Sequence, residues 1–239
     1  MTWSIVARDA SGALGVIVVS RFFAVGSLCP YALSGVGALS TQALVNPLYG
    51  QRGLTRLAQG MAPTDVVRTL VYPDAGRDHR QVHLIDAEGN LAVHTGVECI
   101  EWCGHVSGDG FSVAGNMLVG PQVIEDTAQF YDAGRELPFA ERLIAAMQAG
   151  EAAGGDKRGR QATALMICTT EAYPALDLRV DDHPDPLAEL NRLYVKSLER
   201  FQPFVGCLPS RARPAGITDR STIEAEIRRF QDECTRRRR

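Results

Sequence analysis

The fold of this chain is decided by residues 2–19, which read Thr2-Trp3-Ser4-Ile5-Val6-Ala7-Arg8-Asp9-Ala10-Ser11-Gly12-Ala13-Leu14-Gly15-Val16-Ile17-Val18-Val19. Trp3, Ile5 and Ala7 alternate with the residues between them, which is the period of a β-strand. Residues 9–12 are turn formers, and the β-branched run that follows is typical of a central strand. The sequence therefore predicts a hairpin whose first strand begins with a threonine.

That threonine, Thr2, is a candidate catalytic nucleophile. If Met1 is removed, Thr2 becomes the N-terminus and holds a hydroxyl and an α-amine on one residue. Such an amine has an ordinary pKa of about 7.7–8.0, which suits a general base at neutral pH. A threonine activated by its own amine is an established nucleophile. Position alone does not separate this reading from an ordinary second residue, so the rest of the chain has to decide.

Bulk properties limit the class of protein. The 239 residues fit one sizeable domain, and 45% hydrophobic with 22% charged residues is typical of a soluble globular protein. A net charge of −3 argues against nucleic acid as a partner. The apolar run Ala13–Val19 is too short to span a bilayer, and no signal peptide precedes Thr2. We therefore expect a cytoplasmic protein without membrane contact, and a homo-oligomer stays open.

Two clusters superficially resemble metal sites. Cys99 and Cys103 lie near His105, but no second ligand pair follows at a suitable spacing. The six cysteines fit free thiols of a reducing compartment. Asp181-Asp182-His183 is followed by Pro184 and Pro186, which favours a turn and a helix start. We expect no metal and no cofactor.

Further elements follow from periodicity and turn residues. Strands are expected at 35–43, 81–86, 91–97, twice within 103–115, at 162–169 and at 176–180, and helices at 47–59, from 63 to before 73, at 121–132, 138–150, 186–201 and 221–234. Strands cluster early, helices come in adjacent pairs, and strands then return. This order predicts an α+β fold with largely antiparallel sheets covered by helices.

The C-terminal part is expected to be separate from this core. Residues 203–219 are rich in proline, glycine and arginine and form the one plausible hinge. We therefore expect a domain at 1–202 and a C-terminal extension with a terminal helix at 203–239. The run Arg236–Arg239 is expected to be a solvated tail rather than an anchor for an acidic surface.

An ordered series of motifs covers residues 2 to about 200. They are Thr2-Trp3-Ser4-Ile5-Val6-Ala7-Arg8-Asp9, Ser20-Arg21-Phe22-Phe23-Ala24-Val25-Gly26, Thr41-Gln42-Ala43, Asn46-Pro47, Gly108-Asp109-Gly110, Gly115-Asn116-Met117-Leu118, Gly154-Gly155-Asp156-Lys157-Arg158-Gly159-Arg160-Gln161 and Asp177-Leu178-Arg179-Val180-Asp181-Asp182-His183-Pro184. On these motifs the chain resembles the DUF1028 family, a poorly characterised bacterial family of the N-terminal-nucleophile (Ntn) hydrolase superfamily. The resemblance implies a four-layer αββα sandwich with two antiparallel sheets between helical layers and a helical C-terminal appendage.

The resemblance to proteasome-type threonine hydrolases also implies catalytic roles. The junction at Thr41-Gln42-Ala43 would supply a backbone N–H to the oxyanion hole, so Gln42 is a candidate. Asn116 would lie beside the amine of Thr2, where it orients that amine or stabilises the oxyanion; turn chemistry after a glycine is the alternative. Asp156 matches an orienting aspartate that would fix the geometry of the amine.

Other residues are candidates for substrate binding. Ser20 and Arg21 stand where proteasome-like enzymes have an acidic residue, and Arg21 would keep the amine neutral or bind a substrate carboxylate. Asn46 either caps the first helix or touches substrate. The cationic loop with Lys157, Arg158 and Arg160 recognises an anionic group or is simply solvated.

These residues lead to an amidohydrolase as the first hypothesis. Thr2 would cleave a C–N amide bond of a small, carboxylate-bearing substrate through an acyl-enzyme. The second hypothesis is a non-catalytic protein that keeps the fold and binds a small metabolite. A third makes Ser20 or Cys29 the nucleophile, although neither has a supporting histidine in sequence. Among the histidines, His94 stands out, and a satisfied core or edge histidine is the simpler account of it.

Overall fold

The computed structural model describes residues 2–237. Its strands are β1 (Thr2–Arg8), β2 (Leu14–Ser20), β3 (Pro30–Leu33), β4 (Gly37–Ala43), β5 (Arg80–Asp86), β6 (Leu91–Thr95), β7 (Gly104–Gly108), β8 (Phe111–Asn116), β9 (Ala162–Cys168) and β10 (Leu176–Val180). Its helices are α1 (Leu48–Ala58), α2 (Pro63–Val71), α3 (Gln122–Ala133), α4 (Phe139–Ala152), α5 (Pro186–Ser197), α6 (Phe201–Val205) and α7 (Arg220–Arg237), with the short 3₁₀ helices η1 (Val25–Ser27) and η2 (Arg77–His79).

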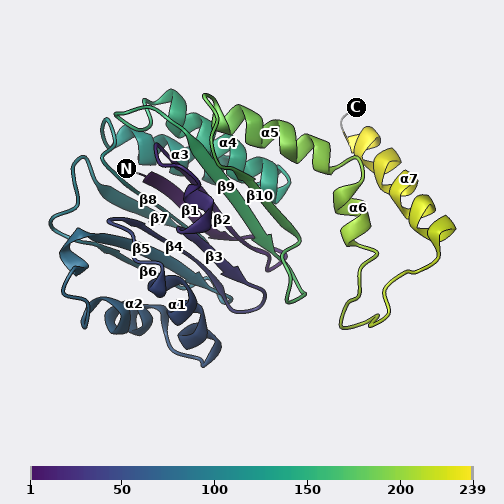
Figure 1. The fold of residues 1–239 in the computed structure, drawn as a ribbon, viewed down its shortest axis with the longest axis horizontal. Helices are drawn as coiled ribbons and strands as arrows, with labels where there is room; N and C mark the ends of the chain where they lie inside the picture. Colours follow the sequence, from purple (N-terminus) through teal and green to yellow (C-terminus); the bar gives the residue numbers. More distant parts are fainter. Residues whose placement is uncertain (1, 238–239) are drawn as a thin grey trace. The chain divides into compact units, whose positions relative to one another are not determined.

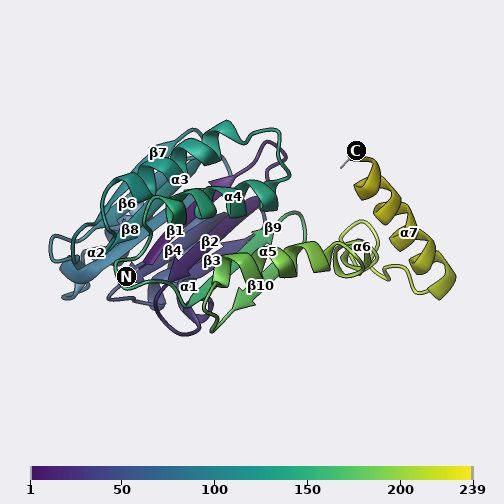
Figure 2. The ribbon, with the colours of Figure 1, turned by 90° about the horizontal axis from the view of Figure 1, so that it is seen from above.

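The strands form two antiparallel sheets between two helical layers. One sheet has the order β10-β9-β2-β1-β8-β7, and the other has the order β3-β4-β5-β6. Helices α3 and α4 cover the outer face of the first sheet, and α1 and α2 cover the outer face of the second (Figures 1 and 2). The predicted four-layer αββα sandwich is confirmed.

Side-chain packing explains both helical layers. Trp3 is on the outer face of β1, and a Cβ atom added to Gly150 of α4 would lie only 3.1 Å from its Nε1 atom. The same Cβ would lie 2.1 Å from Thr127 Oγ1 of α3, so the close packing of α3 and α4 over this sheet requires a glycine there. On the other side, a separate apolar core joins the second sheet to α1 and α2; its fully buried members include Leu39, Val66, Val82 and Leu84.

The layer between the two sheets is apolar at one end of β1 and polar at the other. At one end Val6 packs against Ala38 and Ile85 of the second sheet in an apolar cluster. Ser4, two residues nearer the N-terminus, instead hydrogen-bonds to polar side chains of that sheet. Because alternate residues of a strand share a face, Thr2 also faces this layer. The threonine therefore lies at the polar end of the interface between the sheets.

Several local predictions differ from the structure. Strand β3 was not predicted, because it is short and begins with Pro30, a residue found at strand starts and edges. The helix predicted at 186–201 is divided into α5 and α6. Helix α1 begins at Leu48, one residue later than expected.

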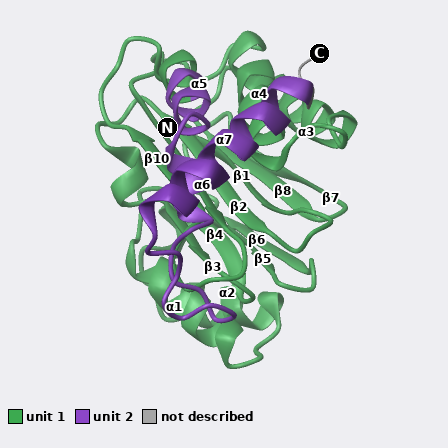
Figure 3. Ribbon diagram, turned by 90° about the vertical axis from the view of Figure 1, so that its right-hand side faces the viewer, with its two compact units in different colours: residues 1–190 green, residues 191–239 purple. Residues whose placement is uncertain are grey.

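The described chain divides into two compact units, residues 1–190 and 191–239 (Figure 3). Both sheets and helices α1–α4 belong to the first unit. Within the second, the Arg200 guanidinium pairs with Glu224. The domain boundary expected at 202/203 stays a prediction, and the arginine run expected to be a solvated tail extends beyond residue 237, the last one described. No helix within residues 2–237 combines the length and hydropathy that a bilayer crossing needs.

Candidate active site

Three polar residues stand side by side where β1 begins and its two neighbours end. Thr2 is in register with Ser20 of β2 and with Asn116 of β8. The Thr2 hydroxyl donates a hydrogen bond to Ser20 Oγ at 3.1 Å, and Asn116 Nδ2 donates to the Thr2 carbonyl at 3.3 Å. Thr2 is only 5% exposed and Asn116 1%. The candidate nucleophile is therefore held in a fixed position at the polar end of the sandwich.

The strand register also fixes the backbone nitrogen of Thr2. Arg8 N–H donates to Gly110 O at 2.9 Å, which makes these two residues a hydrogen-bonded pair of the β1–β8 ladder. Hydrogen-bonded pairs alternate along antiparallel strands, so Thr2 and Asn116 are again such a pair. The nitrogen that becomes the α-amine after removal of Met1 therefore faces the Asn116 carbonyl. Met1 itself is outside the described residues.

Buried amide side chains connect this row to the second sheet. Gln81 of β5 is the centre: its Oε1 accepts hydrogen bonds from Asn116 Nδ2 at 3.1 Å and from Gln42 Nε2 at 2.8 Å. Its own Nε2 donates to Thr95 Oγ1 at 3.0 Å and to the Gly115 carbonyl at 3.0 Å. The network orients the Asn116 side chain, and through it the first residue of β1.

The same hydrogen bonds indicate the roles of the Gln42 and Asn116 side chains. Asn116 Nδ2 donates to Gln81 and to the Thr2 carbonyl, and Gln42 Nε2 donates to Gln81 and to the Ala114 carbonyl. Both N–H groups of each amide are thus engaged within the protein. These contacts favour a positioning role for both side chains over direct contact with an oxyanion.

A buried histidine, which the sequence did not single out, continues the network. The Ser4 hydroxyl donates to Gln42 Oε1 at 2.7 Å, so at its oxygen it accepts from His83 Nε2–H, 2.8 Å away. His83 Nδ1 is then the acceptor for the Ser112 hydroxyl at 3.1 Å. Complete burial, with a smaller contribution from His105, lowers the pKa of His83 to about 3. The ring is therefore neutral and has a single tautomer.

Asp156 fastens the cationic loop to the end of β2. Its Oδ2 accepts the backbone N–H of Arg21 at 3.2 Å and its Oδ1 accepts that of Arg158 at 2.7 Å. The Gln161 N–H donates to the Ser20 carbonyl at 3.0 Å. Asp156 thus acts on the residue that follows Ser20, and its expected role beside the amine stays a prediction.

The cations of this loop differ in their partners. Arg160 forms ion pairs with Glu151 at 2.6 Å and with Asp185 at 3.0 Å. Lys157 Nζ donates to the Glu101 carbonyl at 3.0 Å. Arg21, which follows β2, is exposed, and within the described residues its guanidinium makes one long hydrogen bond, 3.5 Å, to the Arg160 carbonyl. Arg21 is accordingly better placed than Arg160 to receive an anionic group.

Asn46 belongs to a second polar cluster, next to the end of β4. Its Oδ1 accepts the Leu48 N–H at 3.2 Å, and its Nδ2 donates to Asp74 at 3.0 Å. Asp74 also accepts from the Tyr49 hydroxyl at 2.6 Å and Arg80 Nε at 3.2 Å. These contacts fit the capping alternative for Asn46, and contact with substrate stays a prediction.

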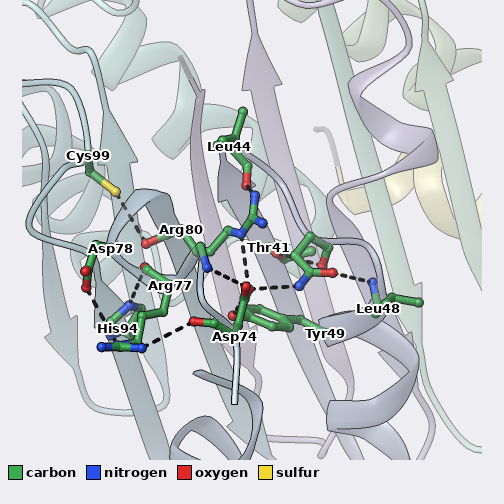
Figure 4. Close-up of polar contacts among 12 residues, drawn as sticks. Thr41, Leu44, Leu48, Tyr49, Asp74, Arg77, Asp78, Arg80, His94 and Cys99 are labelled. Carbon is green, nitrogen blue, oxygen red and sulfur yellow. Dashed lines mark hydrogen bonds and ion pairs between the residues drawn. The ribbon is translucent and has the colours of Figure 1, made fainter. Parts of the chain in front are cut away.

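The charge of Asp74 organises this cluster. Burial alone would raise the pKa of Asp74, but hydrogen bonds from Tyr49, the Gly76 N–H, Asn46 and Arg80 outweigh it and hold the pKa well below its usual range. Arg80 also donates to the Leu44 carbonyl (Figure 4). The cluster therefore fixes the corner where β4 ends. His94, on edge strand β6, contacts the Arg77 carbonyl at 3.0 Å in the same region.

A cavity of about 220 Å³ opens between this corner and the end of β8. It is lined by Ala43, Leu44, His79, Glu98, Cys99, Ile100, Asn116 and Met117. Ala43 and Met117 have φ angles of 67° and 55°, a left-handed conformation that costs a residue other than glycine about 1–3 kcal/mol. Such strain is concentrated at functional sites, and here two strained residues border one cavity.

Comparisons with known proteins fit this structure. A sequence model of the family described as "Family of unknown function (DUF1028)" matches residues 2–190. The crystal structure of protein SPO2555 from Silicibacter pomeroyi, assigned to the same family, is similar at 30% identity and a TM-score of 0.85, over 91% of this chain and 96% of that one. No curated protein matches this chain in sequence.

Two further solved structures are more distant. Anbu (ancestral beta-subunit) from Yersinia bercovieri has 14% identity and a TM-score of 0.38, over 87% of this chain and 98% of that one. The Anbu (Gly-1) mutant from Hyphomicrobium sp. strain MC1 has 13% identity and a TM-score of 0.40, over 83% and 95%. TM-scores this low support no inference about this chain. The family match over residues 2–190 and the similarity to SPO2555 show that the chain belongs to the DUF1028 family.

Proposed function

We propose that this protein is an Ntn-type amidohydrolase in which Thr2, exposed by removal of Met1, cleaves a C–N amide bond of a small substrate. One observation carries the proposal: the Thr2 side chain lies in the polar end of the layer between the sheets, with its hydroxyl 3.1 Å from Ser20 Oγ and its backbone paired with Asn116. A hydroxyl and an amine on one ordered residue are the parts that this mechanism needs.

The reaction has two balanced steps. The α-amine of Thr2 takes the hydroxyl proton as Oγ1 bonds to the substrate carbonyl carbon, and the C–N bond then breaks as the departing nitrogen receives that proton. An ester of Thr2 remains. Water, deprotonated by the same amine, attacks the ester carbon; the bond between that carbon and Oγ1 then breaks, Oγ1 takes the proton from the amine, and the acyl group leaves with the water oxygen as a carboxylic acid. No cofactor takes part in either step.

The oxyanion donor we assign is the backbone N–H of Ala43. Thr41 N–H donates to Cys29 O at 3.0 Å, so alternation along β4 turns the N–H of Ala43 toward the same edge, away from β5. Ala43 lies beyond Ser40, the last β4 residue in register with β3, and it lines the cavity. A donor of this kind stabilises the transition state by about 2.7–4 kcal/mol.

A substrate carboxylate would be bound by Arg21. Its guanidinium is exposed at the end of β2, next to the strand that begins with Thr2. Arg160 is a weaker candidate because Glu151 and Asp185 already neutralise it. An exposed guanidinium can hold a carboxylate through two parallel hydrogen bonds.

The test combines mass and activity. Intact-mass measurement of active protein from its native host should show the chain without Met1. N-acyl amino acids are then assayed with wild type, Thr2→Ala, Thr2→Ser and the control Thr55→Ala, which removes an exposed hydroxyl of α1. Thr2→Ala should lose activity by roughly 10⁶-fold, as loss of a serine nucleophile does, whereas Thr2→Ser and Thr55→Ala retain it. Active protein that keeps Met1, or an active Thr2→Ala variant, would refute the mechanism. Substrate binding without turnover in processed wild type would favour the non-catalytic alternative.

A further inference from the structure

We infer that the cavity beside Asn116 binds an apolar acyl group, about the size of a phenylacetyl group, and that the substrates are N-acyl amino acids carrying such a group. This inference deepens the proposed function and rests on it for the identity of the scissile bond. The binding site itself is argued from the cavity.

The cavity and Arg21 lie on opposite sides of the candidate nucleophile. The strand order β2-β1-β8 puts β1 between its two neighbours. Arg21 follows β2, whereas Asn116 and Met117, which line the cavity, end and follow β8. An amide whose carbonyl carbon reaches Thr2 thus has its acyl part toward the cavity and its nitrogen substituent toward Arg21. A carboxylate on that substituent makes the substrate an N-acyl amino acid.

The lining of the cavity favours an apolar group. Five of its eight lining residues are apolar: Ala43, Leu44, Cys99, Ile100 and Met117. Burial raises the pKa of the Cys99 thiol to about 11, so this side chain is uncharged at neutral pH. The volume of about 220 Å³ exceeds the roughly 150 Å³ of an apolar cavity that accepts benzene. A phenyl ring with an additional methylene therefore fits by size.

The carboxylate of Glu98 at the cavity disfavours an anionic acyl group. Glu98 and His79 also line the cavity, and both residues are exposed. The carboxylate of Glu98 disfavours a second carboxylate beside it, and an apolar pocket desolvates any charge that enters. Succinyl and similar acyl groups should therefore bind poorly, even though the substrate carries a carboxylate on its amino-acid side.

The shape of the cavity is set by the backbone. Met117 N–H donates to the Ile100 carbonyl at 2.7 Å, which ties two walls together. On the third wall, Leu44 N–H donates to His79 O, and the Leu44 carbonyl accepts from Arg80. A wall held in this way before binding loses little conformational freedom when it is occupied, which favours selection of the acyl group by size.

The test is a titration that does not require turnover. Full-length Thr2→Ala, labelled with ¹³C at the methionine methyl groups, is titrated with N-phenylacetylglycine, N-acetylglycine and N-succinylglycine. The Met117 signal, assigned by its loss in Met117→Leu, should shift and saturate with the first compound. Affinity for the other two should be at least about tenfold lower. Met61, which lines a different cavity next to the β5–β6 turn, is the internal control and should not shift.

Matched variants locate the binding site. Ile100→Asp should weaken binding of N-phenylacetylglycine by about tenfold or more, whereas Val97→Asp, with the same charge on the same segment, should not. Both positions tolerate the change because Ile100 is 61% and Val97 85% exposed. Leu44→Asp is a second variant of the cavity wall.

An unshifted Met117 signal, equal binding of N-succinylglycine, or equal affinity of Ile100→Asp and Val97→Asp would overturn the inference. Because Thr2→Ala is used throughout, binding without any hydrolysis by wild type would refute the proposed function and leave the acyl site intact.

Discussion

Replacing His83 with glutamine should reduce the pH dependence of stability between pH 7 and pH 5. His83 is fully buried between the sheets, with Nε2 bonded to Ser4 and Nδ1 to Ser112. Glutamine also carries a donor group, its amide NH₂, and an acceptor oxygen, so it preserves part of this bonding but does not titrate. We expect it to lower the free energy of unfolding at pH 7 by about 1–3 kcal/mol.

The magnitude of the pH effect follows from linkage. The His83 pKa falls from 6.5 to about 3 on folding, so near pH 5 the unfolded chain binds a proton that the folded protein does not. Stability associated with neutral His83 is therefore complete above pH 6.5 and is lost progressively as the pH falls toward 3. Between pH 7 and pH 5 this single group should account for about 2 kcal/mol. Burial lowers the pKa of His105 as well, which adds a loss of the same sign in both proteins.

Urea unfolding at pH 7, 6 and 5 measures the effect. The free energy of unfolding of wild type should fall by about 2 kcal/mol more over this range than that of His83→Gln. His94→Gln is the control, because it removes a histidine from edge strand β6 and keeps His83. If wild type and His83→Gln lose stability equally between pH 7 and pH 5, the buried neutral ring is refuted.

Two further predictions concern residues that hold the walls of the site. Asp74→Asn should lower the free energy of unfolding at pH 7 by about 2 kcal/mol or more in urea melts, because Arg80 loses its charged partner. The stability that comes from the depressed pKa of Asp74 is complete above its ordinary value of 3.8 and is lost progressively below it, so the difference from wild type should shrink as the pH falls below 3.8; a constant difference would contradict the assignment. Gly96→Ala should lower the stability measured in thermal melts by at least about 2 kcal/mol, because its Cβ would be 2.2 Å from the backbone oxygen of Asp78. The control Gly89→Ala, in open space at a φ of 95°, should lower it by only about 1–2 kcal/mol. Equal losses would show that the crowding at Gly96 is relieved.

The fold was predictable because its deciding signals are local. Strict alternation in Thr2–Arg8, a turn and a β-branched run define a hairpin without knowledge of the remaining chain. Proline and glycine define the ends of α2 and of the β5–β6 hairpin in the same way. Strand β3 lacks such a signal, since its four residues form a strand only because β4 lies beside them.

The polar network was beyond prediction for a different reason. Gln81 and His83 alternate with Val82 and Leu84 on β5, and this pattern by itself describes a strand with one face in water. The polar face is buried because the first sheet covers it, with Ser4 and Asn116 supplying the partners. The sequence signal for the network was the polar pair Gln81 and His83 on one face of a strand whose other face is strongly apolar. That signal indicates a buried network only when it is known that a second sheet covers the polar face. The neutralisation of Arg160 by Glu151 and Asp185 likewise depends on contacts between distant segments.

The interface between the sheets argues that the polar network serves positioning rather than stability. At its far end the same two sheets pack through an apolar cluster that includes Val6, Ala38 and Ile85, so the sandwich does not need buried amides to form. Replacing a buried polar group and its partner with apolar residues of the same shape is often neutral or stabilising, whereas leaving one partner unsatisfied is costly. A chain selected only for stability would have continued the apolar layer to the end of β1. What the network does instead is fix Asn116, and Asn116 fixes the first residue of the strand. The polar network therefore lies at the end of the layer where Thr2 begins β1.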